Sequence, residues 1–184
     1  MQRIPSPAGV TVSYDNYGEG PPLVLVHGSF SDHKTNWEFV KPVFETQFTV
    51  YAIARRGRGE TDSTKGHSLE DESRDVVAVI RSIGEPVFLL GHSYGAQTAL
   101  AAAAQVPDRV RKLVLYEPAS PRIVEKEALG RSRSLGSHIT ITSIASERRE
   151  THGPLIHRLW RQFFTFNDQR RAPIQEGRRR CGVY

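Results

Sequence analysis

The most reactive arrangement in this chain is a serine, Ser93, at the centre of the pattern Gly-His-Ser-Tyr-Gly at 91–95. The apolar run 86–90 precedes the pattern, and the small, helix-forming stretch 94–105 follows it. A serine between a buried strand and a helix lies on a sharp turn that holds its hydroxyl clear of the sheet. The pattern therefore predicts a nucleophile for acyl transfer. The alternative is a tight turn in which Ser93 only caps the following helix.

The elements that would position this serine alternate along the chain as strands and helices. Strands are predicted at 10–17, 23–26, 48–54, 86–90 and 112–116. Helices are predicted over 36–44, 68–83 and 94–105, with Asn36 and Ser68 as N-caps and acidic residues 70–72 at one helix start. This alternation indicates a mostly parallel, doubly wound α/β sheet with helices on both faces. Ligands bind beyond the carboxyl ends of such strands, where Ser93 falls.

Composition sets broad limits on the kind of protein. The chain has 184 residues, of which 38% are apolar, and its mean hydropathy is −0.43. One cysteine, Cys181, excludes an internal disulfide and a cysteine metal cluster. The first residues contain no apolar signal segment, and no apolar run reaches membrane-spanning length. These features predict a single-domain cytoplasmic protein with no membrane partner.

Positive charge is confined to the last third of the chain. Residues 1–118 hold 12 Lys/Arg and 14 Asp/Glu, a net charge of −2, whereas residues 119–184 hold 13 and 6, a net charge of +7. This division disfavours a nucleic-acid-binding domain. The arginines at 55, 56 and 58 are predicted to pair with carboxylates or face solvent, with phosphate binding as the alternative.

Four signatures in order resemble the α/β-hydrolase superfamily, over about residues 8–120. They are Val-Leu-Val-His-Gly at 24–28, Arg-Gly-Arg-Gly-Glu-Thr at 56–61, the serine pattern at 91–95 and Leu-Val-Leu-Tyr-Glu-Pro at 113–118. The resemblance is strongest to small bacterial hydrolases of the esterase, haloperoxidase-like and dehalogenase-like branch. It implies that residues 1–120 are the N-terminal part of an α/β-hydrolase core.

The resemblance also implies a mechanism and a site. Ser93 would attack the carbonyl of a small ester-type substrate and form an acyl-enzyme, without a metal or an organic cofactor. The backbone N–H groups of Tyr94 and Ser29 would hold the oxyanion. The residues expected to support these groups are His27, Gly28, Gly91, His92 and Gly95. Of these, His27 would be structural in the oxyanion loop, and His92 would pack or line the pocket.

The remaining members of a catalytic triad are harder to find in the sequence. Glu117, at the end of the strand 112–116, is the best candidate acid; its alternative role is to shape the pocket. The histidines that follow Ser93 in the chain are His138, His152 and His157. None of them follows a buried strand, as the base of the family does, and a serine without a base is a poor nucleophile.

The strand and helix pattern ends after Pro118, and residues 121–184 are predicted to form an irregular, Arg-rich tail with one helix at 155–166. We interpret this tail as a cap remnant, a truncation or out-of-frame sequence; the alternative is a divergent short hydrolase whose tail supplies the cap and the histidine. The sheet would then stop at 112–116, and its exposed edge would suit a homodimer.

Two classes of function remain open. The first is a serine hydrolase of the α/β-hydrolase fold, whose activity depends on a base that the sequence does not identify. The second is an inactive relative that binds nucleic acid or an acidic partner through its basic tail. A histidine donated by a partner chain is a further possibility, and it predicts an activity that falls on dilution.

Overall fold

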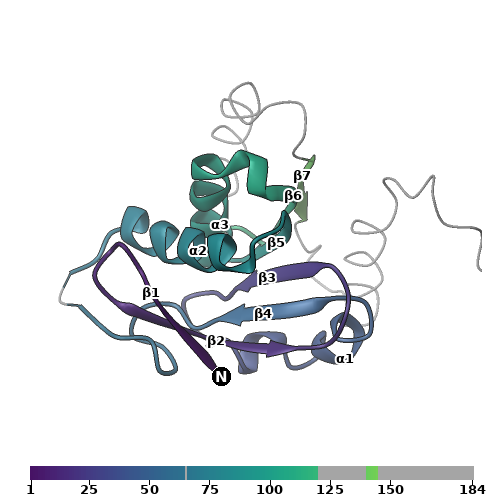
Figure 1. The fold of residues 1–184 in the computed structure, drawn as a ribbon, viewed down its shortest axis with the longest axis horizontal. Coiled ribbons are helices and arrows are strands. Elements are labelled where there is room, and N and C mark those ends of the chain that lie inside the picture. The colour runs from purple at the N-terminus through teal and green to yellow at the C-terminus, as the bar shows by residue number, and fades with distance from the viewer. Residues whose placement is uncertain (65, 120–139, 145–184) are drawn as a thin grey trace, which may run out of the picture.

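Seven strands of the described chain form one sheet, in the order β1-β2-β4-β3-β5-β6-β7. The computed structural model describes residues 1–64, 66–119 and 140–144 (Figure 1). The strands are β1 Gln2–Pro5, β2 Thr11–Tyr17, β3 Pro22–Val26, β4 Thr49–Ile53, β5 Val87–His92, β6 Val110–Tyr116 and β7 Thr140–Ile144. All neighbours from β4 to β7 are parallel, and β1 and β2 pair antiparallel at one edge. The mostly parallel sheet that the sequence predicts is thus confirmed.

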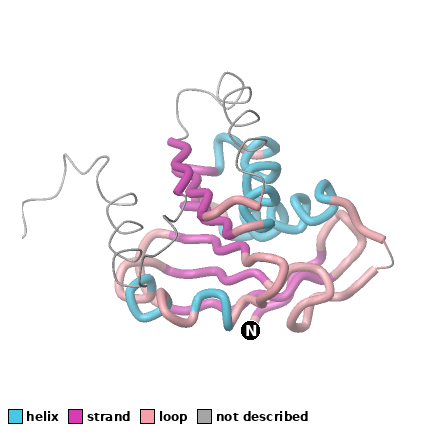
Figure 2. The backbone as a smooth tube through the Cα atoms, turned by 180° about the vertical axis from the view of Figure 1, so that it is seen from behind, coloured by secondary structure: helices cyan, strands magenta, loops and turns pink. Residues whose placement is uncertain are grey.

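Helices cover both faces of this sheet. They are η1 Thr35–Trp37, α1 Lys41–Phe44, α2 Leu69–Ile83, α3 Tyr94–Gln105 and η2 Pro107–Arg109. Side chains alternate along β3, so Val24 packs in the cluster with α2 and α3, while Leu25 packs with Trp37 and Phe44 on the other face. Figure 2 shows the strands lying between these two groups of helices. The continuous apolar run in β3 is therefore explained by burial on both faces.

Helix α2 begins and ends where the sequence predicts. The Ser68 hydroxyl accepts a hydrogen bond from the Asp71 N–H, and the Asp71 carboxylate accepts one from the Ser68 N–H, which together form a capping box. Gly84 ends the helix with a φ of 82°, a conformation that glycine adopts without strain. The valines and Ile80 on its inner side are buried against α3 and the sheet.

The helix predicted over 36–44 is wrong in its detail. The chain forms two short pieces there, η1 and α1, and Asn36 does not cap a helix. Its Oδ1 instead accepts hydrogen bonds from the Gly28 N–H, at 3.3 Å, and from His92 Nδ1, at 2.8 Å. Asn36 therefore ties the loop after β3 to the end of β5, and the two helical pieces are separated at residues 38–40.

The sheet continues for one strand beyond its predicted end at 112–116. β7 pairs in parallel with β6, from Lys112 opposite Thr140 to Tyr116 opposite Ile144. The prediction that 112–116 is the exposed edge of the sheet is therefore wrong. Because β7 occupies that edge, the argument for a homodimer through it no longer applies. β1, a short and mostly exposed strand, was also not predicted. The helix predicted at 155–166 lies outside the described residues.

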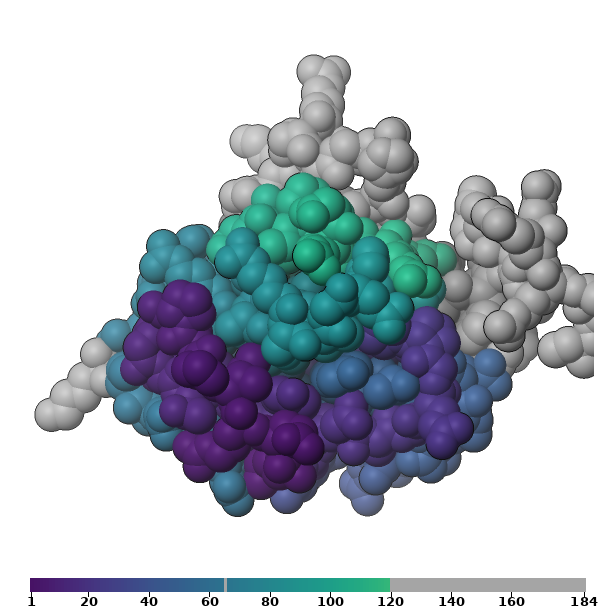
Figure 3. Space-filling view, in the orientation of Figure 1, coloured from purple at the N-terminus to yellow at the C-terminus, as the bar shows by residue number. Residues whose placement is uncertain are grey.

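The N-terminal segments and the α2–α3 layer form one continuous body. In the space-filling view, the purple residues of the N-terminal strands lie directly against the teal residues of the central helices (Figure 3). Among the helices of the described ranges, none combines the length and apolar character needed to cross a membrane.

Candidate active site

The turn between β5 and α3 holds Ser93 in a conformation that few side chains adopt. Ser93 has φ 54° and ψ −121°, and with Glu117 it is one of the two described non-glycine residues with positive φ. Its N–H donates to the Tyr116 carbonyl at 2.9 Å, which ties the turn to β6. Its side chain makes no capping hydrogen bond to α3, so the alternative of Ser93 as a helix cap is not supported.

The glycines on either side of Ser93 are required by close backbone contacts. A Cβ on Gly91 would lie 2.4 Å from the Gly95 carbonyl oxygen. A Cβ on Gly95 would lie 2.3 Å from the Val26 carbonyl oxygen and 2.4 Å from that of His27. No side chain fits at these distances, so α3 can start this close to β3 and β5 only with glycine at both positions.

The loop after β3 lies directly against Ser93. A Cβ on Gly28 would be 3.1 Å from Ser93 Cβ, so the peptide that joins Gly28 to Ser29 borders the serine side chain. The Tyr94 N–H is at the first position of α3, where a helix offers no internal partner. The two predicted oxyanion donors, Ser29 and Tyr94, are thus carried by the segments on either side of Ser93.

His27 is fully buried below this loop and uses both ring nitrogens on backbone groups. Its Nδ1 donates to the Gly28 carbonyl at 2.8 Å, and its Nε2 accepts from the Arg55 N–H at 3.1 Å. These two bonds fix the neutral tautomer with the proton on Nδ1. Burial lowers the pKa of His27 to about 4, so the ring is neutral near pH 7. The geometry supports a structural role for His27.

Two arginines after β4 pair with buried carboxylates of α2. Arg55 bonds Glu72 through Nε at 2.6 Å and Nη2 at 3.1 Å. Arg56 bonds Asp75 through Nε at 2.6 Å and Nη2 at 3.1 Å. Both pairs are bidentate, which is the strongest geometry for a guanidinium and a carboxylate. The predicted pairing of these two arginines with carboxylates is confirmed, and neither guanidinium is placed to bind a phosphate.

The sequence did not identify Glu72 and Asp75 as partners of these arginines. From the sequence, the acidic residues 70–72 are expected only to be favourable charges at a helix N-terminus. In the structure, Glu72 and Asp75 lie three residues apart on α2 and are 3% and 4% exposed. Residues three apart lie on the same side of a helix, so two carboxylates at this spacing can face one neighbouring loop. The adjacent Arg55 and Arg56, followed by this acidic spacing, are the sequence signal that could have identified the two ion pairs.

On the other side of Ser93, His92 and Glu117 form a looser arrangement. His92 Nε2 lies 3.9 Å from Glu117 Oε2, and the His92 ring stacks on Tyr116 with centroids 5.1 Å apart. Burial lowers the pKa of His92, and the nearby Glu117 carboxylate partly opposes this by raising it. His92 Nδ1 is bonded to Asn36, so the ring is packed beside the Ser93 turn, and its role as a pocket wall stays a prediction.

Within the described residues, no hydrogen bond joins a histidine to the Ser93 hydroxyl. Besides His27 and His92, His67 Nε2 lies 3.1 Å from Glu72 Oε1, and His33 Nε2 lies 3.4 Å from Asp15 Oδ2. The histidines at 138, 152 and 157 lie outside the described residues. Within the described ranges, no group of three or more His, Cys, Asp or Glu side chains is arranged to hold a metal ion.

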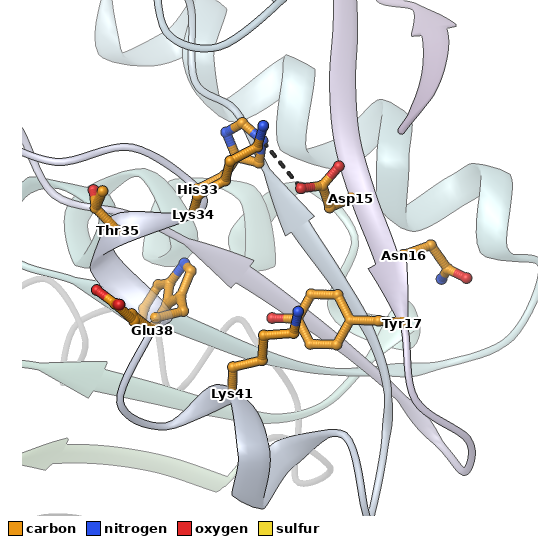
Figure 4. A pocket seen from close by; sticks show the side chains of 9 residues that line it. Asp15, Asn16, Tyr17, His33, Lys34, Thr35, Glu38 and Lys41 are labelled. Atoms are coloured by element: carbon orange, nitrogen blue, oxygen red, sulfur yellow. Dashed lines mark ion pairs between the residues drawn. The ribbon is translucent and has the colours of Figure 1, made fainter.

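Two hollows lie near these loops. The first has a volume of about 430 Å³ and contains Ser29 together with Phe30, whose side chain is fully exposed. The second has a volume of about 610 Å³ and is shown in Figure 4. It is lined by Asp15, Asn16, Tyr17, His33, Lys34, Thr35, Trp37, Glu38 and Lys41. None of the predicted site residues lines this second hollow, so only the first borders the predicted oxyanion loop.

A sequence model described as the alpha/beta hydrolase family matches residues 23–180 of the chain. The pyrrolizixenacetamide deacetylase of Xenorhabdus hominickii is 38% identical over 109 residues, which cover 56% of this chain and 40% of that protein. The 2-(acetamidomethylene)succinate hydrolase of Mesorhizobium japonicum is 33% identical over 122 residues, covering 65% of this chain and 43% of that protein. The chain thus spans less than half the length of these two relatives.

The fold is also similar to that of solved structures. The crystal structure of an alpha/beta hydrolase from Sphaerobacter thermophilus superposes with a TM-score of 0.58 and 30% sequence identity. The match covers 72% of this chain and 55% of that one. The sequence and structure comparisons therefore agree on one family.

Proposed function

Because the chain belongs to the alpha/beta hydrolase family, we propose that it is a serine hydrolase that cleaves a small ester-type substrate through an acyl-enzyme on Ser93. One observation carries this proposal: Ser93 has a φ of 54° on a turn that glycines 91 and 95 allow. Strained backbone of this kind occurs where a side chain has to be presented to a ligand. The relatives named as a deacetylase and a hydrolase support the cleavage of small acyl compounds.

In the proposed reaction, Ser93 Oγ attacks the carbonyl carbon and gives up its proton to a general base. The negative charge that develops on the carbonyl oxygen is held by the N–H groups of Ser29 and Tyr94. The C–O bond to the leaving group then breaks as the protonated base gives its proton to the leaving oxygen. The same base next takes a proton from water, whose oxygen attacks the acyl carbon and releases the acid, and returns the proton to Ser93. The hollow beside Ser29 and Phe30 is the proposed approach of the substrate to this loop; Ser93 is not among the residues that line it.

The proposal assigns Glu117 as the acid of the triad. Glu117 follows β6, next to the Ser93 turn, and its φ of 43° is the second positive value outside glycine in the described chain. The general base has to come from outside the described residues, where His138, His152 and His157 lie. The observation that favours the second candidate, an inactive relative that binds partners, is that no described histidine is hydrogen-bonded to Ser93.

Hydrolysis of p-nitrophenyl acetate by the full chain and by Ser93→Ala tests the proposal. We expect Ser93→Ala to lower kcat/KM by about 10³-fold or more, because a serine and its base act as a unit. Ser82→Ala is the matched control, since the Ser82 hydroxyl bonds only Val79 of its own helix, α2. Equal hydrolysis by the wild type and Ser93→Ala, or none by the wild type, would refute the proposal and favour the binding role.

A further inference from the structure

Arg55 links the two segments that carry the proposed oxyanion donors. Its Nη1 donates to the Gly28 carbonyl at 3.0 Å and lies 3.4 Å from the His27 carbonyl. Its guanidinium carbon lies 4.5 Å from the centroid of the Tyr94 ring, over the ring face. Gly28 belongs to the loop after β3 and Tyr94 opens α3, so one side chain spans both sides of Ser93.

The bond to the Gly28 carbonyl acts on the N–H of the next residue. The carbonyl of Gly28 and the N–H of Ser29 belong to the same planar peptide group and point in opposite directions. Two donors, His27 Nδ1 and Arg55 Nη1, hold the oxygen of this group. They fix the plane of the peptide and therefore the direction of the Ser29 N–H. Hydrogen bonds in a chain also polarise one another, which makes that N–H a stronger donor.

The position of Arg55 is itself fixed by α2. Glu72 holds Nε and Nη2 in a bidentate pair, and the Glu72 side chain is 3% exposed. The Arg55 side chain is 10% exposed. A guanidinium held through two nitrogens of one edge and stacked on an aromatic ring has little freedom to rotate. Its remaining nitrogen, Nη1, is therefore held toward the Gly28 carbonyl before any substrate binds.

We propose that Arg55 is a positioning residue of the oxyanion hole, which orients and polarises the Gly28–Ser29 peptide while it supports the Tyr94 segment. This inference rests on the proposed function of Ser93. The neighbouring Arg56 provides the natural comparison, because it pairs with the same helix in the same geometry. Its further contacts are to the Ala8 carbonyl and Thr64, away from Ser93.

The test compares Arg55→Lys with Arg56→Lys in the full chain, using p-nitrophenyl acetate. Lysine keeps the charge and loses the planar fork that reaches two groups at once. A lost oxyanion donor costs about 10²–10³ in kcat, so loss of its support should lower kcat by about 10- to 100-fold. We expect KM to change by less than about twofold, because the interaction strengthens only in the transition state. Arg56→Lys should lower the stability of the fold and keep kcat per folded molecule within about twofold.

A rescue experiment separates positioning from a general loss of structure. Arg55→Ala leaves a space that a guanidinium ion fits, so added guanidinium at millimolar concentration should restore part of kcat in a saturable way. The same salt should not raise kcat of the wild type. Unchanged kcat in Arg55→Lys, or equal losses of kcat in Arg55→Lys and Arg56→Lys, would overturn the positioning role. Absence of Ser93-dependent hydrolysis in the wild type would instead refute the proposed function, and the inference with it.

Discussion

On the α2 side of Ser93, Arg55 and Arg56 bond buried carboxylates at 2.6 Å, whereas on the β6 side His92 lies 3.9 Å from Glu117. The side chains of the Arg56 pair are 2% and 5% exposed, and those of His92 and Glu117 are 27% and 35% exposed. The side chains around the proposed oxyanion donors are thus held by buried ion pairs within the described residues. On the proposed acid–base side, the side chains are partly exposed, and Glu117 is the proposed acid there.

This difference has an energetic meaning. A buried ion pair costs desolvation energy, and removal of one partner leaves an unpaired buried charge that strongly destabilises the fold. A partly exposed pair is solvated in either state and contributes little to stability. The α2 side should therefore respond strongly to single substitutions, and the β6 side should be adaptable. Three predictions test this contrast, beginning with the largest expected effect.

Arg56→Met should lower the free energy of unfolding by about 3–5 kcal/mol, because it leaves the buried Asp75 carboxylate without its cation. Urea denaturation of the full chain measures this loss. The double variant Arg56→Met/Asp75→Leu is the control, since removal of both charges should recover part of the stability. A loss below about 1 kcal/mol in the single variant would place this pair in the same class as an exposed one.

Acid should destabilise the α2 side through His27. The folded state holds the pKa of His27 near 4 instead of 6.5, so the unfolded chain takes up the proton first as the pH falls. Stability is fully present above pH 6.5, declines toward about pH 4, and has then lost about 3 kcal/mol. Urea midpoints across this range measure the decline.

His27→Gln is the control for this pH dependence, because glutamine keeps an acceptor for the Arg55 N–H and does not titrate. Burial also lowers the pKa of His33 and His92, so part of the decline should remain in the variant. If the stability of His27→Gln falls with pH as steeply as that of the wild type, His27 is not a neutral residue that holds the loop after β3.

Glu117→Gln should change the free energy of unfolding by less than about 1 kcal/mol, because the carboxylate is partly exposed and its partner is distant. The sharper readout is the His92 ring, followed by NMR titration. The Glu117 carboxylate raises the pKa of His92, so the variant should show a lower pKa for this ring. An unchanged His92 pKa would show that the two side chains do not interact in solution.

The sequence predicts the parts of this molecule whose signals are local. Short apolar runs such as 23–26 and 86–90 are typical of strands covered on both faces of a parallel sheet, and Ser68 and Gly84 mark the limits of α2. The turn at Ser93 is predicted because its glycines are required by contacts between adjacent elements. The same local signals predict that the loop after β3 lies close to Ser93, and the structure brings Gly28 against the Ser93 side chain.

The features that the sequence did not predict depend on distant partners. β7 pairs with β6 across a long connection, and its run of alternating isoleucine and threonine has no neighbouring pattern that marks it as a strand. The Asn36 side chain bonds Gly28 and His92 instead of capping a helix, and these partners lie 8 and 56 residues away in the chain. The buried role of Glu72 depends on Arg55, which lies 17 residues earlier in the chain.

The central claim is that Ser93 is the nucleophile of an oxyanion site assembled by the loop after β3 and the start of α3. Labelling of the full chain with a fluorophosphonate, followed by mass spectrometry of its peptides, tests this claim directly. The reagent forms a stable bond with an activated serine and mimics the tetrahedral intermediate. We predict one phosphonyl group on the peptide that contains Ser93, and no labelling of Ser93→Ala. An unlabelled wild type, or a label on another residue that persists in Ser93→Ala, would contradict the account.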